Sequence, residues 1–234
     1  MNCAKGRRGA TVRSRKGKSM SYQTILFDLD GTLTEPAEGI TNSVAYALAK
    51  FGITVTDREE LLRFIGPPLM DSFMEYYGFD EAKARQAVAY YREYFSVKGL
   101  FENSVIQGIK ELLEELQAAG KQLVVATSKP EYFSLQILEK FDLLSYFTFV
   151  AGATMDETRT RKADVIAYAL EHISYEAKAS TVMVGDRHHD IEGARALGLD
   201  AIGVTFGYGS REELQGAGAT YVVDTIAQLR QRLL

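Results

Sequence analysis

The sequence has a single cysteine, Cys3, among its 234 residues. One cysteine cannot form a disulfide framework within the chain or a cysteine-based metal site. No apolar run approaches the roughly 18 to 20 residues that a membrane-spanning helix needs, so no membrane association is predicted. These absences fit a reducing compartment, and we expect a cytoplasmic protein. Hydrophobic residues make up 46% and charged residues 25%, which is typical of a folded globular chain.

The charges are unevenly distributed. Residues 1–20 contain seven Lys or Arg and no acid, which leaves 20 basic residues against 31 acidic ones in the rest of the chain. An acidic body is a poor partner for nucleic acid, because phosphate contacts need clustered Lys and Arg. The basic segment lacks the apolar stretch of a secretion signal, and we interpret it as a disordered leader before an internal start at Met20. A nucleic-acid-binding arm is the alternative.

From residue 100 onward, short apolar runs alternate with amphipathic segments. Continuously apolar strands separated by helices are typical of a parallel sheet covered on both faces, which predicts an α/β fold. We expect strands at 22–27, 122–126, 147–151, 181–184, 201–204 and 221–223. Helices are expected at 107–119, 131–140, 162–171, 191–197 and 226–233.

The segment 36–100 has no strong strand pattern and is predicted to be helical. Helices are expected at 40–51, 59–65, 69–77 and 81–95. We interpret this segment as an insertion after the first strand. The predicted division is a leader at 1–20, a core formed by 21–35 and 101–234, and an inserted helical domain at 36–100.

Polar side chains occur where three of the expected strands end. Ligands bind beyond the carboxyl ends of the strands in an open α/β sheet. Clustered carboxylates raise one another's pKa and resist ionisation, so such a group implies a compensating cation, and all-oxygen ligands favour Mg²⁺ over Zn²⁺. The side chains at these strand ends are Asp28 and Asp30, Thr127 and Ser128, and Asp186 and Asp190.

Each of these positions also has an ordinary structural explanation. Asp30-Gly31 is a common turn, and Thr127 could cap the following helix. Asp190 could be the N-cap of a helix that starts at Ile191, and Lys162 alone would be a solvated lysine. The order of the residues and their shared placement at strand ends favour a functional site over these separate explanations.

Four motifs in this order resemble those of the haloacid dehalogenase (HAD) superfamily, and the resemblance extends from Tyr22 to Leu234. It implies a Rossmann-like parallel sheet and, in one large branch of the superfamily, an α-helical cap inserted where residues 36–100 lie. The four motifs are Asp28-Leu29-Asp30-Gly31-Thr32, Thr127, Lys162, and Gly185-Asp186-Arg187-His188-His189-Asp190.

The resemblance implies hydrolysis of a phosphate monoester in two steps. Asp28 would attack phosphorus and form an aspartyl-phosphate, which water then hydrolyses. Asp30 would protonate the leaving alkoxide and later deprotonate the water. Dehalogenases have no alkoxide to protonate and resemble this pattern only at the first aspartate, so Asp30 favours phosphoryl transfer over carbon–halogen cleavage.

The resemblance also implies a Mg²⁺ ion held by Asp28, Asp186 and the backbone carbonyl of Asp30. Asp190 would support the metal or the motif lysine from behind. The expected phosphate-binding residues are Thr127, Ser128 and Lys162.

Two positions depart from the family pattern. Ala163 follows Lys162 where many relatives have proline, which leaves Lys129 as the alternative for the lysine's role. Ser128 stands where many relatives have asparagine. For the pair His188-His189, we expect packing or a contact behind the metal instead of metal ligation. Insertion residues expected to face the site are Glu38, Thr41, Asn42, Ser43 and Pro67.

Within the superfamily, the chain is similar to the phosphoglycolate phosphatase branch and to its bacterial 5′-nucleotidase-like members. The sequence leaves the substrate open among small phosphorylated metabolites, and it leaves the oligomeric state open. A phosphomutase resembling β-phosphoglucomutase and a catalytically inactive binding protein are the alternatives. The stretches that carry the closer resemblance are Gly39-Ile40-Thr41, Ile65-Gly66-Pro67-Pro68-Leu69 and Gly207-Tyr208-Gly209-Ser210.

Overall fold

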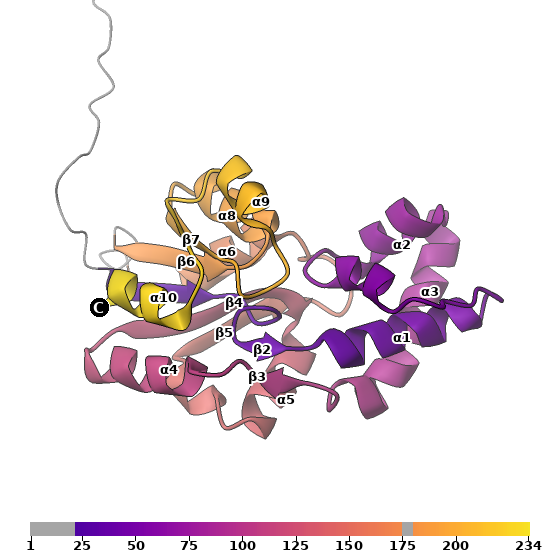
Figure 1. The fold of residues 1–234 in the computed structure, drawn as a ribbon, viewed down its shortest axis with the longest axis horizontal. Helices are drawn as coiled ribbons and strands as arrows, with labels where there is room; N and C mark the ends of the chain where they lie inside the picture. Colours follow the sequence, from indigo (N-terminus) through magenta and orange to yellow (C-terminus); the bar gives the residue numbers. More distant parts are fainter. Residues whose placement is uncertain (1–21, 175–179) are drawn as a thin grey trace, which may run out of the picture.

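A six-stranded parallel sheet is the centre of the computed structural model, which describes residues 22–174 and 180–234 (Figure 1). The strand order is β5-β4-β1-β6-β7-β8, so the first strand lies in the middle of the sheet. The predicted α/β class is therefore confirmed, whereas the basic segment 1–20 lies outside the described residues. The strands are β1 (Thr24–Phe27), β4 (Gln122–Pro130), β5 (Phe149–Ala153), β6 (Thr181–Gly185), β7 (Asp200–Val204) and β8 (Tyr221–Val223).

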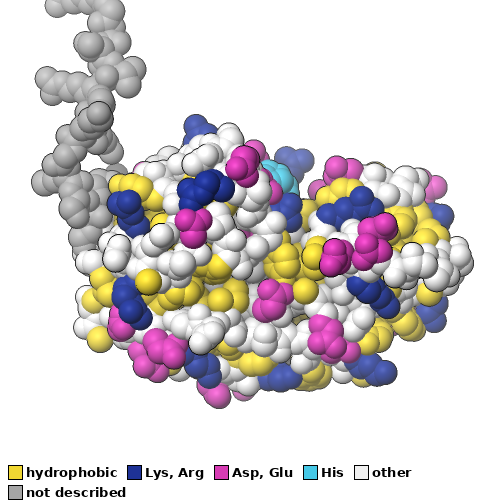
Figure 2. All heavy atoms as spheres, viewed as in Figure 1, with side chains coloured by type: hydrophobic (Ala, Val, Ile, Leu, Met, Phe, Trp, Pro, Cys, Tyr) yellow, Lys and Arg dark blue, Asp and Glu magenta, His cyan; other side chains and the backbone are white. Residues whose placement is uncertain are grey.

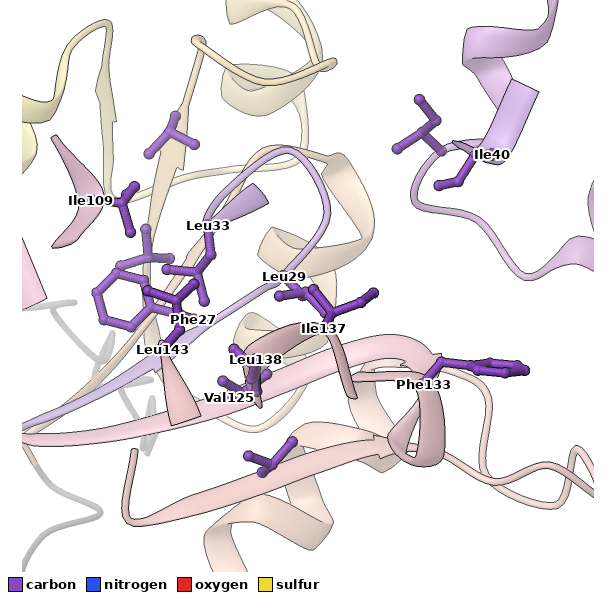
Figure 3. Close-up of a cluster of buried hydrophobic side chains, with 14 of the residues drawn as sticks. Phe27, Leu29, Leu33, Ile40, Ile109, Val125, Phe133, Ile137, Leu138 and Leu143 are labelled. Carbon is purple, nitrogen blue, oxygen red and sulfur yellow. The ribbon is translucent and has the colours of Figure 1, made fainter. Parts of the chain in front are cut away.

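Helices cover both faces of the sheet because successive strand residues point to opposite sides. Leu26 packs with α6 (Lys162–Glu171), α8 (His188–Ala196) and α9 (Arg211–Gly216) on one face. Its neighbours Ile25 and Phe27 pack on the other face. Figure 3 shows Phe27 and Val125 in that second layer, together with Leu29 and with side chains of the helix that follows β4 in the chain. The helices of the second layer are α4 (Ile109–Ala118), α5 (Glu131–Lys140) and α10 (Ile226–Leu233).

The helical insertion, residues 37–99, forms a second body at one end of the sheet (Figure 1). A two-stranded antiparallel ribbon, β2 (Thr34–Glu35) paired with β3 (Ser104–Val105), connects it to the core. Its buried centre contains stacked and edge-on aromatic rings, for example Phe64 against Phe73. Its elements are α1 (Ala37–Ala49), the 3₁₀ helix η1 (Glu59–Phe64), α2 (Leu69–Tyr77), α3 (Glu81–Tyr94) and the π-helical turn η2 (Phe95–Gly99).

Several expected boundaries were wrong for local reasons. The helix expected at 191–197 begins at His188, because the Asp190 carboxylate accepts the backbone N–H of Arg187 and caps the helix from inside its first turn. Asp190 is therefore not the N-cap. β4 continues to Pro130 through a register shift after Ala126. The short helix α9, capped by Ser210, and the strands β2 and β3 were not predicted.

The surface charges are mixed on the face seen in Figure 2, where acidic and basic side chains are interspersed. The absence of a nucleic-acid partner stays a prediction. In the part of the chain that the structure describes, no helix is long and apolar enough to span a membrane.

Close backbone contact between α1 and η2 generates a stability prediction. A Cβ atom at Gly39 would lie 2.0 Å from the carbonyl oxygen of Gly99, so Gly39→Ala must separate the two segments. We expect a loss of about 1 to 3 kcal/mol in the free energy of unfolding, measured by urea denaturation. Gly216→Ala is the control, since no atom outside the neighbouring residues and backbone of its own helix lies within 4 Å of its Cβ position, and it should change stability by less than about 1 kcal/mol. Equal effects of the two variants would contradict the packing argument.

Candidate active site

The turn after β1 brings the first and fourth motifs into contact. Gly31 has φ +81°, and a Cβ atom there would lie 2.3 Å from Oδ2 of Asp186. Thr32 donates a hydrogen bond from its hydroxyl to Oδ1 of Asp186, at 3.2 Å. Glycine is therefore required for both conformation and close approach, and threonine fixes the neighbouring carboxylate. This contact gives the Asp-Gly-Thr sequence a physical reason.

Three carboxylates meet at the carboxyl ends of β1 and β6. Asp28, Asp186 and Asp190 are all buried, and each offers an oxygen within 4.8 Å of the others. Burial raises the pKa of Asp186 well above its usual range, and the charges of Asp190 and Asp28 raise it further. Burial likewise raises the pKa of Asp190, to about 6. The group resists full ionisation unless a cation joins it.

Lys162 lies between two of these carboxylates. Its Nζ is 2.7 Å from Oδ1 of Asp28 and 2.7 Å from Oδ1 of Asp190, and it donates to the carbonyl oxygen of Ala126. Burial alone would lower the pKa of this lysine, but the two aspartates outweigh burial and raise it. The lysine is therefore charged at neutral pH and is held against Asp28.

Lys129 has a different partner. Its Nζ lies 2.5 Å from Oδ2 of Asp30 and 4.8 Å from the centre of the Phe95 ring. Burial raises the pKa of Asp30, and the ammonium of Lys129 opposes that rise. The two lysines that the sequence left as alternatives for one role thus contact different aspartates, Lys162 with Asp28 and Lys129 with Asp30.

The charge balance of the site fits a divalent cation. Four buried carboxylates, with two buried lysines among them, leave two negative charges when all six groups are ionised. The donors are carboxylate oxygens, which suit Mg²⁺ better than softer metals. The residues that could hold it are Asp28, Asp186 and Asp190.

A cavity of about 390 Å³ opens between the site and the helical insertion. Asp28, Asp30, Thr127 and Ser128 line it on the core side. On the insertion side most of the lining residues are apolar and include the whole turn 66–69, but the charged residues Asp71, Glu81, Arg85 and Arg92 also line the cavity there. The main apolar residues are Ile40, Phe64, Pro67, Leu69, Met74, Val88 and Phe95.

Of the insertion residues expected to face the site, only Pro67 lines the cavity in the described structure. The hydroxyls of Thr41 and Ser43 donate to carbonyl oxygens one helical turn earlier, and Asn42 donates to Glu102. Glu38 does not line the cavity either. The expectation was therefore wrong for these four residues. From α1, Ile40 lines the cavity instead.

The fourth motif also contacts the insertion. Arg187 donates to the carbonyl oxygen of Ile65, at 2.6 Å, and pairs with Glu213 at 3.0 Å. Glu213 also accepts from Nδ1 and the backbone N–H of His188. Burial alone would raise the pKa of Glu213, but these hydrogen bonds lower it to about 2.

His189 and the exposed Glu192 approach His188 closely enough to suggest a second metal site. The positive charges of Arg187 and Lys162 lie near enough to influence His189 and would repel a metal ion there, which opposes this interpretation. Burial, followed by the charges of His188, Arg187 and Lys162, lowers the pKa of His189 to about 4.

The chain is similar to several known proteins in sequence and in structure. Residues 25–204 match the family described as "Haloacid dehalogenase-like hydrolase". A protein named 5′-nucleotidase from Pseudomonas aeruginosa is 48% identical, over 92% of this chain and 97% of its own length. A protein named tyrosine-protein kinase PtkA from Mycobacterium tuberculosis is 39% identical, over 91% of this chain and 73% of its own length. The crystal structure of a predicted phosphatase from Clostridium acetobutylicum is 51% identical and superposes with a TM-score of 0.88, covering 91% and 98% of the two chains. More distant relatives are named phosphoglycolate phosphatase.

The buried ion pairs of Lys162 with Asp28 and Asp190 lead to a prediction about stability. Lys162→Met removes the only cation that contacts Asp28 among the described residues and leaves two buried carboxylates uncompensated. We expect a loss of about 3 to 5 kcal/mol in the free energy of unfolding, measured by urea denaturation at neutral pH without added metal. The control is Lys110→Met, which breaks an exposed pair with Asp142 and should cost less than about 1 kcal/mol. A Lys162→Met loss as small as the control's would refute the assigned electrostatic role.

Proposed function

The chain belongs to the haloacid dehalogenase-like hydrolase family, and from this we propose that it hydrolyses a small phosphomonoester through a phosphorylated Asp28. The family resemblance, predicted from the motifs, and the α/β sheet with flanking helices, predicted from the alternation of apolar strands and helices, are both confirmed. Relatives and structural neighbours named as phosphatases confirm the predicted enzyme class, a phosphatase. The two-step mechanism, the metal and the substrate are the proposal.

The observation that carries the mechanism is the separate environment of two neighbouring aspartates. Asp28 and Asp30 line the same cavity, but each is held by its own lysine. Asp28 lies in the carboxylate cluster and contacts Lys162. A nucleophile that attacks an anionic phosphate needs positive charge nearby, and Lys162 supplies it. Asp30 lies outside that cluster, and its burial raises its pKa. Two carboxyl groups in different environments are suited to different steps of one reaction.

In the first step, Asp28 attacks phosphorus and the bond to the leaving oxygen breaks, while Asp30 gives that oxygen a proton. In the second step, Asp30 takes a proton from the water that attacks the aspartyl-phosphate. Thr127 and Ser128 line the cavity beside Asp28 and can bind phosphoryl oxygens. Lys162 holds Asp28 in position and balances part of its charge.

We propose that Mg²⁺ is held by Asp28, Asp186 and the backbone carbonyl of Asp30, with Asp190 behind them. When bound, it would offset the repulsion between the anionic nucleophile and the anionic phosphate. Support comes from the two uncompensated negative charges of the buried cluster.

The walls of the cavity favour a substrate with an apolar or flat body. A phosphate at the Asp28 end would leave its organic group against Phe64, Leu69 and Phe95. A nucleoside offers such a group, whereas a short hydrophilic acid would use only the charged residues of the same wall, such as Arg85 and Arg92. The relative named 5′-nucleotidase gives the same indication. We therefore place 5′-nucleotides ahead of phosphoglycolate.

Phosphate release from a panel of monoesters tests the proposed function. The panel contains 5′-nucleotides, phosphoglycolate, hexose phosphates and p-nitrophenyl phosphate, each with and without Mg²⁺. We expect Mg²⁺-dependent release that is fastest with a 5′-nucleotide and is reduced roughly 10⁴-fold or more in Asp28→Asn. Circular dichroism of the variant controls for folding.

The other outcomes of the panel separate the alternatives. Near-wild-type release by Asp28→Asn would exclude Asp28 as the nucleophile. Conversion of hexose phosphates without phosphate release would favour a mutase. No reaction with any compound would favour an inactive binding protein or, given the relative named tyrosine-protein kinase, transfer to a protein acceptor.

The raised pKa values of the cluster predict a pH-dependent metal affinity. Burial raises the pKa of Asp190 to about 6 and that of Asp186 well above its usual range, so protons compete with Mg²⁺ for these groups. Isothermal titration calorimetry at pH 8 and pH 5.5 should show weaker Mg²⁺ binding at the lower pH, by up to about tenfold per pH unit for each displaced proton. Asp186→Asn should bind Mg²⁺ weakly at both values. An affinity independent of pH would contradict the assignment.

A further inference from the structure

The two carboxylate oxygens of Asp30 have different surroundings. Oδ2 accepts from Nζ of Lys129 at 2.5 Å. Oδ1 is buried and has no hydrogen-bond partner among the described residues. Leaving a buried polar atom without a partner costs free energy, and such atoms are found at sites where a ligand, a water or the reaction itself supplies the partner. Asp30 lines the cavity, so a substrate bound there would lie beside its carboxyl group.

Lys129 is itself held tightly. Its side chain is 6% exposed, and its backbone N–H donates to the hydroxyl oxygen of Thr127 in the bulged end of β4. Its ammonium faces the ring of Phe95, the first residue of η2 in the insertion. The lysine thus has a fixed position between the core and the insertion. A fixed cation can hold one oxygen of a carboxylate in one orientation.

We propose that Lys129 is a positioning residue that binds Oδ2 of Asp30 and so presents Oδ1 to the leaving oxygen of the substrate. The proposal rests on the proposed function, because it assumes that Asp30 exchanges the proton. It differs from the role considered for Lys129 from the sequence, which was to contact the transferring phosphoryl group.

The proton balance explains why a cation is useful at this place. When the P–O bond breaks, the proton on Oδ1 moves to the leaving oxygen and a negative charge remains on Asp30. That charge forms in a buried place, where an isolated carboxylate is costly. Lys129 is already in contact with it, so little rearrangement is needed during the step. In the second step the proton of the attacking water returns to Asp30.

The leaving group provides the test. The p-nitrophenolate ion leaves without a proton at neutral pH, whereas the alkoxide of a 5′-nucleotide needs one. We compare kcat/KM for both substrates, since this constant covers the steps up to formation of the aspartyl-phosphate, and the second step is common to both. Lys129→Met should lower kcat/KM roughly 10- to 100-fold for the 5′-nucleotide and less than about threefold for p-nitrophenyl phosphate. Activity on the second substrate shows that the variant is folded.

Two further variants make the result specific. Lys140→Met is the matched control, because Lys140 also faces an aromatic ring and donates to a carbonyl oxygen, but on the exposed side of α5. It should leave both constants unchanged. Lys129→Arg retains the charge and should recover part of the lost activity on the nucleotide. An equal loss on both substrates would show that Lys129 binds the phosphoryl group or supports the fold, and it would overturn the proposal, as would no loss on either.

Asp30→Asn separates a failure of this inference from a failure of the proposed function. If Asp30 exchanges the proton, Asp30→Asn loses activity selectively on the 5′-nucleotide, and adding Lys129→Met to it causes little further selective loss. Selective loss in Asp30→Asn but not in Lys129→Met would overturn only the role of Lys129. Equal loss on both substrates in Asp30→Asn would overturn the proton role of Asp30 itself. Inactive wild-type protein would overturn the proposed function.

Discussion

Repulsion between buried carboxylates is the constraint on which this structure depends. Parallel strands end at one edge of the sheet, so the aspartates that follow β1 and β6 are brought together with little water around them. Such a group is stable only with nearby positive charge. The chain supplies two buried lysines from separate elements, Lys162 at the start of α6 and Lys129 at the end of β4. The negative charge that remains would be balanced by a bound divalent cation.

The backbone around the cluster is adapted to the same constraint. Gly31, Gly207 and Gly209 all lie where a Cβ atom would be within 2.5 Å of Asp186. Two loops therefore pack directly on this carboxylate, and Tyr208 donates its backbone N–H to it. Close packing excludes water, which strengthens every charge interaction inside the site. The glycine-rich stretch 207–209 is thus part of the site although it carries no catalytic side chain.

The sequence predicted the sheet and the residues at its carboxyl edge because both follow from local patterns. Apolar runs such as 181–184 are followed within two positions by a polar residue. That order alone predicts that Asp186 lies at the carboxyl edge of the sheet. What could not be predicted depends on contacts between distant segments. The partner of Lys129 is 99 positions away in the chain, and no spacing rule distinguishes it from the partner of Lys162. The boundaries at His188 and Pro130 were missed because a side-chain cap and a bulge override the apolar pattern.

Pro67 was expected to face the cavity, but the lining residues from the helices of the insertion were missed for a related reason. A helix such as α1 has one apolar stripe, and the same residues can cover a core or a ligand. Ile40 does both, since it packs in the large hydrophobic cluster and lines the cavity. Polar residues one position away were more conspicuous in the sequence, but they bond within or beside their own helix. The apolar part of the cavity wall is therefore made by residues that a sequence shows only as hydrophobic.

Arg187 connects the loop that carries Asp186 to the helical insertion. It adjoins Asp186 in the chain, and its guanidinium is bonded both to the carbonyl oxygen of Ile65 in the insertion and to Glu213 in the core. Separation of the insertion from the core at this turn breaks the first of these bonds. Because free energies of linked equilibria are reciprocal, an occupant that binds the loop of Asp186 more tightly when this bond is intact would favour the bonded arrangement, and the bond would favour that occupant to the same degree.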